Sequence, residues 1–381
     1  MATIHEILRP LTLTKVISQI AATTNRLLMF FEMGPGGANE TYVGHGRQGS
    51  YRVFDNVRSA TLGRAPGTPA GRRSRRPVKE IPFVYPRSHE EVYLLAEEIH
   101  NISKISDPRM RDEAGADFIR QQTRPVGQRN GNWRTQQIVG MMRDSLYVVE
   151  DGDDWYFSTS SSGSLYRINY QMPSGNKDQL DMLGDGSIID TPWSNPNANI
   201  PRHCQEINAA FLELNGGRLT DVFVNHVQWD NVVNNDYVAA GHGIANPPFK
   251  TFEREVGTGP DGIPINEQVG TLLNVPGVTW HITDEGLEWG APGSETYDKH
   301  IGNNNAWFGV GPREFPDVYQ MYQGSEPIVE YDNGPETVKI GAQSWSKKSS
   351  NPTGTEIFQL DNALAVNHVP NGSAYGTVDN F

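Results

Sequence analysis

The chain has 381 residues, of which 32 are Lys or Arg and 45 are Asp or Glu, and its formal net charge is −13. Its one cysteine, Cys204, excludes disulfides within the chain and cysteine-based metal clusters, and we expect it to be a buried side chain in a helix. No apolar run reaches the roughly 18 residues that a membrane-spanning helix needs, and the first residues lack the pattern of a signal peptide.

Residues 1–40 are predicted to form an N-terminal arm. A short helix is expected over residues 14–24, with Thr14 as its cap and with apolar residues at helical spacing. A run rich in glycine and proline starts at Gly34 and indicates a bend. This run lacks the Gly-Lys-Ser/Thr sequence of a phosphate-binding loop, so we interpret it as a hinge.

Residues 41–87 are predicted to form a long two-stranded arm. The first strand lies within residues 41–57, where aromatic and β-branched residues recur, and the second begins at Ile81. Two prolines in the second strand favour an edge or a free-standing ribbon over a central place in a sheet.

The segment between these two strands concentrates positive charge. From Asn56 to Lys79 there are seven basic residues and no acidic one, among many glycines and prolines. The basic residues are Arg58, Arg64, Arg72, Arg73, Arg75, Arg76 and Lys79. Such a segment cannot form a core of its own. Because the whole chain is at −13 and this stretch contributes +7, the remainder sums to −20, which favours docking on an acidic surface of another copy of the chain.

The next segments are predicted to be helical. Residues 88–100 begin with a capping box and continue with apolar residues at helical spacing. Asp107 and Pro108 indicate the start of a second helix, with the aspartate as cap and the proline in the first position. Pro125 and Gly127 interrupt its pattern, which leaves open two helices or one long kinked helix.

The second half of the chain is predicted to mix strands and helices. Residues 155–193 indicate short strands with turns, and residues 200–310 indicate an α/β module that starts with a helix and carries a second helix near 227–233. Within this module we expect strands at 221–224, 278–283 and 306–310. Residues 315–381 are polar and strand-like, without a helix.

Motifs for metal binding or nucleophilic catalysis are absent from the sequence. There is no His-Glu-x-x-His and no Gly-x-Ser-x-Gly. The acidic run 151–154 is the best metal-like cluster, but it lacks the alternating ligands and the distant glutamate of a calcium loop, so we interpret it as a solvated helix end. His226 and His281 are interpreted as structural residues.

This order of parts resembles that of the major capsid proteins of tailed bacteriophages with the HK97-like fold, of the phage lambda capsid protein E type. The matching parts are the arm, the two-stranded loop with its basic tip, the return Tyr85-Pro-Arg-Ser-His-Glu, the capped helix, the long helical region over 107–150, the α/β module and the β-rich tail. The resemblance implies an α+β fold with five segments. They are an N-terminal arm (1–40), an extended β-hairpin called the E-loop (41–87), a P-domain with a spine helix (88–199), an A-domain (200–310) and a second P-domain part with the C-terminal tail (311–381).

The resemblance also implies a function that needs no cofactor and no enzymatic activity. Such a protein self-assembles into an icosahedral shell of hexamers and pentamers that encloses the double-stranded DNA of a tailed phage. Its E-loop lies across a neighbouring subunit, where arginines pair with carboxylates and fix the register of the contact more than its strength. The residues expected to make these intersubunit contacts are Arg64, Arg72, Arg73, Arg75, Arg76, Lys79, Phe83 and Tyr85.

The partners and the location follow from the same resemblance. The implied protein partners are other copies of the chain, a scaffolding protein, a portal and a cement or decoration protein. Contact with packaged DNA is expected to be weak and non-specific, and no contact with a membrane is expected. The family often carries a long scaffolding segment ahead of the arm, whereas here only residues 1–40 precede the E-loop, so we expect a separate scaffolding protein. The expected location is the virion capsid, after assembly in the host cytoplasm.

Two other functions remain as alternatives. A carbohydrate-active hydrolase would need a cleft with two carboxylates about 5–10 Å apart, and the acid pairs Glu253/Glu255 and Asp284/Glu285 are interpreted as surface charge. A nucleic-acid-binding protein would use Arg72 to Arg76 and show a salt-dependent affinity. The lack of aromatic residues among these arginines, and the charge of −20 elsewhere, argue against the second alternative.

Overall fold

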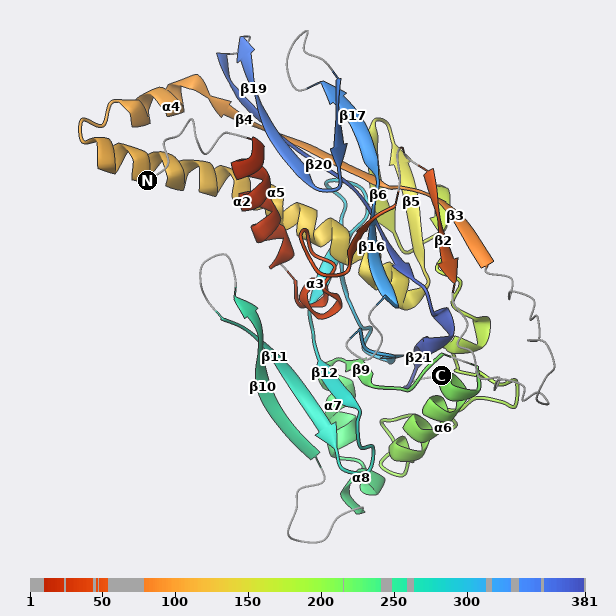
Figure 1. Cartoon of the computed structure of the whole chain (residues 1–381). Helices are drawn as coiled ribbons and strands as arrows, with labels where there is room; N and C mark the ends of the chain where they lie inside the picture. Colours follow the sequence, from red (N-terminus) through yellow and green to blue (C-terminus); the bar gives the residue numbers. More distant parts are fainter. Residues whose placement is uncertain are drawn as a thin grey trace, which may run out of the picture.

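Helix α5 (Pro108–Arg143) is 36 residues long and is the longest described element of the computed structural model (Figure 1). The body is elongated, with α4 and the beginning of α5 at one end and α8 at the other (Figure 1). The structure describes residues 10–23, 25–43, 46, 48–53, 79–214, 216–240, 249–258, 264–312, 317–329, 336–350 and 353–379.

Helix α5 begins as predicted and is one helix rather than two. The Asp107 side chain caps it by accepting a hydrogen bond of 2.9 Å from the backbone N–H of Arg109. Pro125 lies inside the helix on its exposed side, where water can satisfy the carbonyl that loses its partner. Gly127 faces helix α2, and a Cβ atom there would lie 2.8 Å from the Cβ of Ile20. The glycine therefore permits a close helix crossing.

The end of α5 differs from the predicted region 107–150. Asp144 follows the last helical residue with φ of 49°, in the left-handed region, and this turn stops the helix. The chain then enters strand β5, so Leu146 and Val149 belong to a strand. Leu146 and Val149 follow the last helical turn at helical spacing. The sequence pattern therefore predicted a helical region that continues beyond the true end of α5.

The predicted helix over residues 88–100 is wrong in its first part. Strand β4 (Arg87–Leu95) occupies most of it, and helix α4 (Ala96–Ser103) begins only afterwards. Ser88, taken as the helix cap, instead lies opposite Asp361 in the ladder between β4 and β20. This long ladder satisfies the backbone of β4 and overrides the local capping signal.

Strand β20 is the centre of a five-stranded sheet. It pairs with β4 and β19 along its first part and with β16 along its last part, and β1 pairs with β16. The strands other than β4 are β1 (Glu40–Tyr42), β16 (Tyr319–Gln323), β19 (Gln343–Ser350) and β20 (Thr353–Asn367). The tail is thus strand-rich as predicted, and the later half of β20 is buried because it packs on α5.

A seven-stranded sheet forms the other half of the body. Its strand order is β10-β11-β12-β9-β15-β21-β8. The bounds are β8 (Lys177–Asp178), β9 (Asp221–Val224), β10 (Phe249–Thr258), β11 (Pro264–Leu272), β12 (Thr279–Ile282), β15 (Asn305–Gly309) and β21 (Ser373–Thr377). The strands predicted at 221–224, 278–283 and 306–310 are confirmed as β9, β12 and β15. The C-terminal strand β21 lies between β15 and β8, within the sheet of the predicted α/β module.

Three helices accompany this sheet. They are α6 (Ile200–Glu213), α7 (His226–Val233) and α8 (Asp236–Ala240). The first two match the helices predicted near Pro201 and near 227–233. Cys204 is buried in α6, as expected, and burial raises the pKa of its thiol to about 12.

Smaller sheets project from the body. They are β2 (Gln48–Val53) with β3 (Lys79–Val84), β6 (Asp154–Ser158) with β5 (Leu146–Asp151) and β7 (Ser164–Ile168), β13 (Gly286–Trp289) with β14 (Thr296–Lys299), and β17 (Ser325–Val329) with β18 (Glu336–Ile340). Two short 3₁₀ turns are η1 (Ser174–Asn176) and η2 (Pro370–Gly372).

The N-terminal helices α2 (Pro10–Ala22) and α3 (Arg26–Phe31) pack on the body. The predicted helix is confirmed, but Thr14 is not its cap, because α2 already begins at Pro10. The Thr14 hydroxyl instead donates a hydrogen bond of 3.1 Å to the carbonyl of Ser344 and accepts one of 2.8 Å from its N–H. This links α2 to the edge strand β19.

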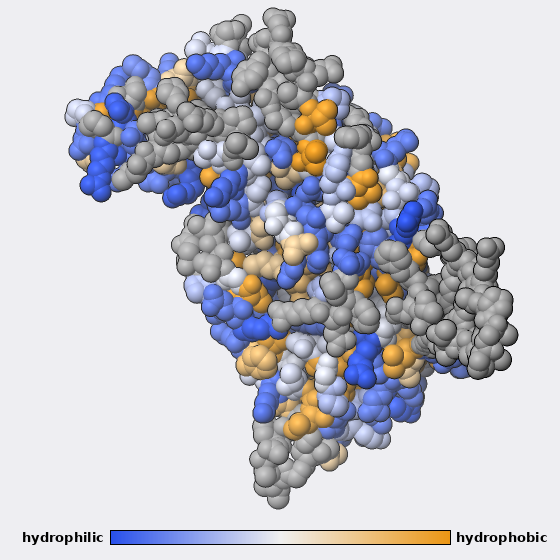
Figure 2. Space-filling model, viewed as in Figure 1, coloured by the Kyte–Doolittle hydropathy of each residue, from blue (hydrophilic) through white to orange (hydrophobic). Residues whose placement is uncertain are grey.

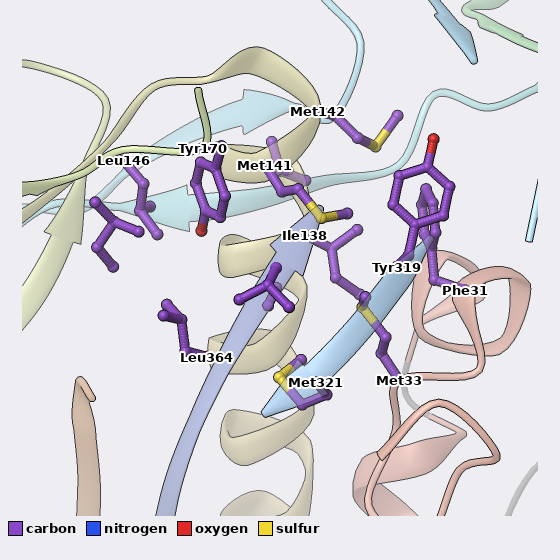
Figure 3. Packing of buried hydrophobic residues seen from close by; sticks show 14 of the residues in the cluster. Phe31, Met33, Ile138, Met141, Met142, Leu146, Tyr170, Tyr319, Met321 and Leu364 are labelled. Atoms are coloured by element: carbon purple, nitrogen blue, oxygen red, sulfur yellow. The ribbon is translucent and has the colours of Figure 1, made fainter. Parts of the chain in front are cut away.

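The largest apolar cluster lies where α5 meets β16, β20 and the end of α3 (Figure 3). Its labelled side chains are Phe31, Met33, Ile138, Met141, Met142, Leu146, Tyr170, Tyr319, Met321 and Leu364. Four of them are methionines, whose flexible side chains fill irregular gaps between helix and strands. Burial of each such side chain contributes about 1.5–3 kcal/mol, so this cluster holds the long helix to the sheet.

Candidate functional site

The hairpin β2–β3 carries the basic segment, which we define as residues Asn56–Lys79. The two strands pair from Gln48 opposite Val84 to Val53 opposite Lys79, so the predicted two-stranded arm is confirmed in its described part. One face of the hairpin is anchored, because Tyr51 and Ile81 are buried. The Tyr51 hydroxyl donates a hydrogen bond of 2.9 Å to the carbonyl of Asn169.

The predicted contact residues fall into two groups. Arg64, Arg72, Arg73, Arg75 and Arg76 lie outside the described residues. Lys79, Phe83 and Tyr85 are described, and they lie along the hairpin and its exit.

The described contact residues already have partners within their own chain. Lys79 donates a hydrogen bond to the side chain of Gln171. Phe83 packs edge-on against Tyr85 with ring centroids 4.8 Å apart, and Tyr85 is only 3% exposed. These two rings therefore anchor the base of the hairpin, and contact with a neighbouring subunit stays a prediction for all eight residues.

A buried arginine joins three distant parts of the chain. Arg134 of α5 is fully buried and donates to both carboxylate oxygens of Asp361 in β20, at 2.6 and 3.0 Å. It also donates to Glu40 of β1 at 2.6 Å and to the carbonyl of Met33 at 3.1 Å. Asn130 donates a further bond of 3.0 Å to Asp361. One side chain thus fixes the N-terminal segment, the long helix and the central strand.

The charge of Arg134 is secured by its surroundings. Burial acts to lower the pKa of the guanidinium, but the carboxylates of Asp361 and Glu40 raise it by more, so it stays protonated. The partners lie 227 and 94 residues away in the sequence. Because no local pattern marks such a contact, sequence reasoning missed it.

A second buried charge lies in the seven-stranded sheet. His281 of β12 has both ring nitrogens against carboxylates, Nε2 at 2.7 Å from Asp221 of β9 and Nδ1 against Glu267 of β11. Arg254 of β10 donates to the other oxygen of Glu267 at 2.8 Å. The His281 ring stacks on Phe223 with centroids 4.4 Å apart. These contacts cross four strands, so the structural interpretation of His281 fits its place.

The pKa values of this cluster move apart. Burial lowers the pKa of His281, but hydrogen bonds to Asp221 and Glu267 outweigh it, and the pKa rises above its ordinary value of 6.5. Burial raises the pKa of Glu267, but His281 and Arg254 outweigh it, and the pKa falls below 4.5. Both His281 and Glu267 are therefore mainly charged between their two ordinary pKa values.

The stability of the subunit is expected to depend on pH through His281. A raised folded pKa gives a contribution that is complete below the unfolded value and is lost as pH rises through the folded value. The urea midpoint of the unassembled wild-type subunit should therefore exceed that of His281→Gln most near pH 5.5, and this gap should shrink toward about pH 9.

The matched control is His226→Gln. The His226 side chain is 51% exposed in its pair with Asp284, so this change should cost little at any pH. A gap for His281→Gln that stays constant from pH 5.5 to about pH 9 would contradict a charged His281.

Of the two acid pairs considered for a hydrolase, Asp284/Glu285 is held by basic groups. Asp284 binds His226 through one oxygen at 2.5 Å and Lys299 through the other at 2.9 Å. Arg26 lies 2.9 Å from Glu285. Burial raises the pKa of Glu285, but the neighbouring Asp284 has both oxygens occupied and is not free to act as a base. The hydrolase alternative gains no support from this site.

The acidic run 151–154 is not a helix end. It forms the tight turn of the β5–β6 hairpin, with Gly152 at φ of 65°. Within the described ranges no group of three or more His, Cys, Asp or Glu residues is arranged to hold a metal ion. Across the same part of the chain no helix is long and apolar enough to cross a membrane.

Comparisons with known proteins give matches among solved structures only. No family model and no curated protein matches the chain. A phage-related protein from Bordetella bronchiseptica RB50 is 10% identical, with a TM-score of 0.47 over 97% of each chain. The virus-like particle from Pyrococcus furiosus is 10% identical, with a TM-score of 0.41 over 95% of this chain and 97% of the other. The mature capsid of bacteriophage PhiM1 is 12% identical, with a TM-score of 0.40 over 90% of this chain and 86% of the other. The chain is thus similar, along most of its length, to a phage-related protein, a virus-like particle and a phage capsid.

Proposed function

We propose that the chain is a major capsid protein with an HK97-like fold, which self-assembles into the icosahedral shell of hexamers and pentamers around the double-stranded DNA of a tailed phage. The observation that carries this proposal is the hairpin β2–β3 with the basic segment Asn56–Lys79 at its open end, on an otherwise acidic chain. The proposed role is structural rather than enzymatic.

The hairpin supports assembly because its base is fixed and its basic segment has no core of its own. Tyr51, Ile81 and Tyr85 hold the hairpin in the body, so the two strand ends that the segment joins are fixed on the subunit. A contact between this segment and a different surface of the next copy is heterologous, and repetition of such a contact closes rings. This is the kind of contact from which hexamers and pentamers are built.

The body supports the proposal because it is stiff. Helix α5 is about 54 Å long at 1.5 Å per residue, and it is fastened to β20 by the apolar cluster and by Arg134. On the face in Figure 2, hydrophobic residues form small separate patches among hydrophilic ones. Contacts on this face would therefore be mainly polar and charged.

We propose that the chain is divided into the domains that the resemblance implies, with one change. The E-loop is 41–87, the P-domain is 88–199 with 311–381, and the A-domain is 200–310. Strand β21 (Ser373–Thr377) pairs with β15 in the seven-stranded sheet, so we assign this strand to the A-domain.

The finer partners are proposed on the same basis. They are a scaffolding protein, a portal, a cement or decoration protein and packaged DNA bound weakly and without sequence preference. The location we propose is the virion capsid, after assembly in the host cytoplasm.

Expression of the chain tests the proposed function directly. We expect closed shells, or rings that precede them, in sedimentation velocity and negative-stain electron microscopy, with a scaffolding protein raising the yield of closed shells. A chain that stays monomeric both alone and with the scaffolding protein would contradict the proposal.

A further inference from the structure

A groove of about 910 Å³ lies between β4, α5, the β5–β6 turn and the β13–β14 hairpin. We propose that this groove binds the basic segment Asn56–Lys79 of a second copy of the chain. The inference rests on the proposed function and names the surface that receives the E-loop. We call it the acidic groove.

The charge of the acidic groove complements that of the basic segment. Asp153 and Asp154 of the β5–β6 turn line it, together with Glu288 of β13 and Glu295 of the following turn. All four side chains are exposed, and in the part of the chain that the structure describes none of them forms an ion pair. The segment offers four closely spaced arginines, Arg72, Arg73, Arg75 and Arg76.

The two arginines of the groove do not cancel this charge, because each already has a carboxylate. Arg129 of α5 pairs with Glu90 at 2.9 Å. Arg87 of β4 pairs with Glu326 at 3.1 Å. The four acids therefore leave the groove with a net negative charge that an incoming basic segment can neutralise.

Aromatic side chains give the groove a second means of recognition. Trp155 is 40% exposed and Tyr297 is 62% exposed, and both line the groove with Trp133. Arginine guanidinium groups stack on such rings, and extended proline-rich segments dock in aromatic grooves. The basic segment contains both arginines and prolines, the latter at Pro66, Pro69 and Pro77.

The hairpin separates the attachment point of the basic segment from the groove of its own chain. The groove is lined by Val84 and Tyr85, at one end of β3, whereas the basic segment joins the hairpin at Lys79, at the other end. These ends are about 17 Å apart at 3.3 Å per residue. The self-assembly proposed above supplies neighbouring copies, so we assign the groove to the segment of a second copy, and the charge exchange below distinguishes this from binding within one chain.

A charge exchange between two variants tests the proposal. The groove variant carries Asp153→Lys, Asp154→Lys, Glu288→Lys and Glu295→Lys, and the segment variant carries Arg72→Glu, Arg73→Glu, Arg75→Glu and Arg76→Glu. Each variant alone should assemble at least about tenfold less than wild type, because like charges then face each other. A mixture of the two should recover assembly, since each variant then supplies the charge that the other needs.

The mixture separates a second copy from the same chain. If the segment bound its own groove, both variants would carry like charges within one molecule, and mixing would recover nothing. Assembly of the groove variant at the wild-type yield would also overturn the proposal. The neutral variant Asp153→Asn, Asp154→Asn, Glu288→Gln, Glu295→Gln should give an assembly yield between those of the wild type and the groove variant. The thermal midpoint of each variant shows whether its subunit still folds.

A binding measurement keeps this test separate from that of the proposed function. A synthetic peptide of residues 56–79 should bind the full-length segment variant, whose groove is intact and free, and should bind a chain that also carries the groove changes at least about tenfold more weakly. Equal binding to both would overturn the groove assignment even if wild-type particles form. Selective binding without any particles would support the groove and contradict the capsid function.

Discussion

Replacement of Arg134 by methionine is expected to lower the free energy of unfolding of the subunit by about 3–5 kcal/mol. The change leaves the carboxylate of Asp361 buried without its guanidinium partner, and it also frees Glu40 and the carbonyl of Met33. Urea unfolding of the unassembled subunit measures the loss. Limited proteolysis should show faster cleavage in the N-terminal segment, since Arg134 links β1 to the helix.

Two companion variants separate the effect of losing the Arg134–Asp361 ion pair from the effect of changing the shape of the side chain. Arg134→Lys keeps the charge but cannot form the paired bonds to Asp361, so it should lose less than Arg134→Met. Arg134→Met with Asp361→Leu removes both charges and should regain part of the stability, because a buried ion pair has a large desolvation cost. An Arg134→Met subunit within about 0.5 kcal/mol of wild type would contradict the fastening role.

The parts of the fold that the sequence reveals are those with local causes. Helix α5 starts where Asp107 and Pro108 mark it, because cap and first-turn proline act within one turn. Strands β9, β12 and β15 each contain a short, mainly apolar run, which is typical of a buried strand. The hairpin β2–β3 follows from alternating residues on either side of a segment that cannot pack.

The parts that the sequence conceals are those with distant causes. Strand β4 is a strand because β20, more than two hundred residues away, supplies its ladder. Pro125 does not end α5, because the carbonyl that loses its partner belongs to Gln121 on the exposed side of the helix, and the rest of the helix is held by packing. The contacts of Arg134 and the groove beside Trp133 both join segments that are remote in the chain, so neither leaves a pattern along it.

Reversal of the four clustered arginines is expected to abolish assembly while the subunit still folds. Particle yield of the segment variant Arg72→Glu, Arg73→Glu, Arg75→Glu, Arg76→Glu should fall by about tenfold or more, because opposed like charges cost several kcal/mol and about 1.4 kcal/mol is already tenfold. Sedimentation velocity measures the yield. The thermal midpoint should hardly change, since these residues lie beyond the strands that anchor the hairpin.

The matched control replaces the same four arginines with lysine. Charge is kept while paired bonding and stacking are lost, so assembly should survive with a lower yield and a stronger sensitivity to salt. If exposed ion pairs each contribute only about 0–1 kcal/mol, the segment acts by fixing the register of many repeated contacts rather than by the strength of any one. A reversed variant that forms particles at the wild-type yield would show that the charge of the segment does not guide assembly, and the anchored hairpin alone would then have to supply the contact.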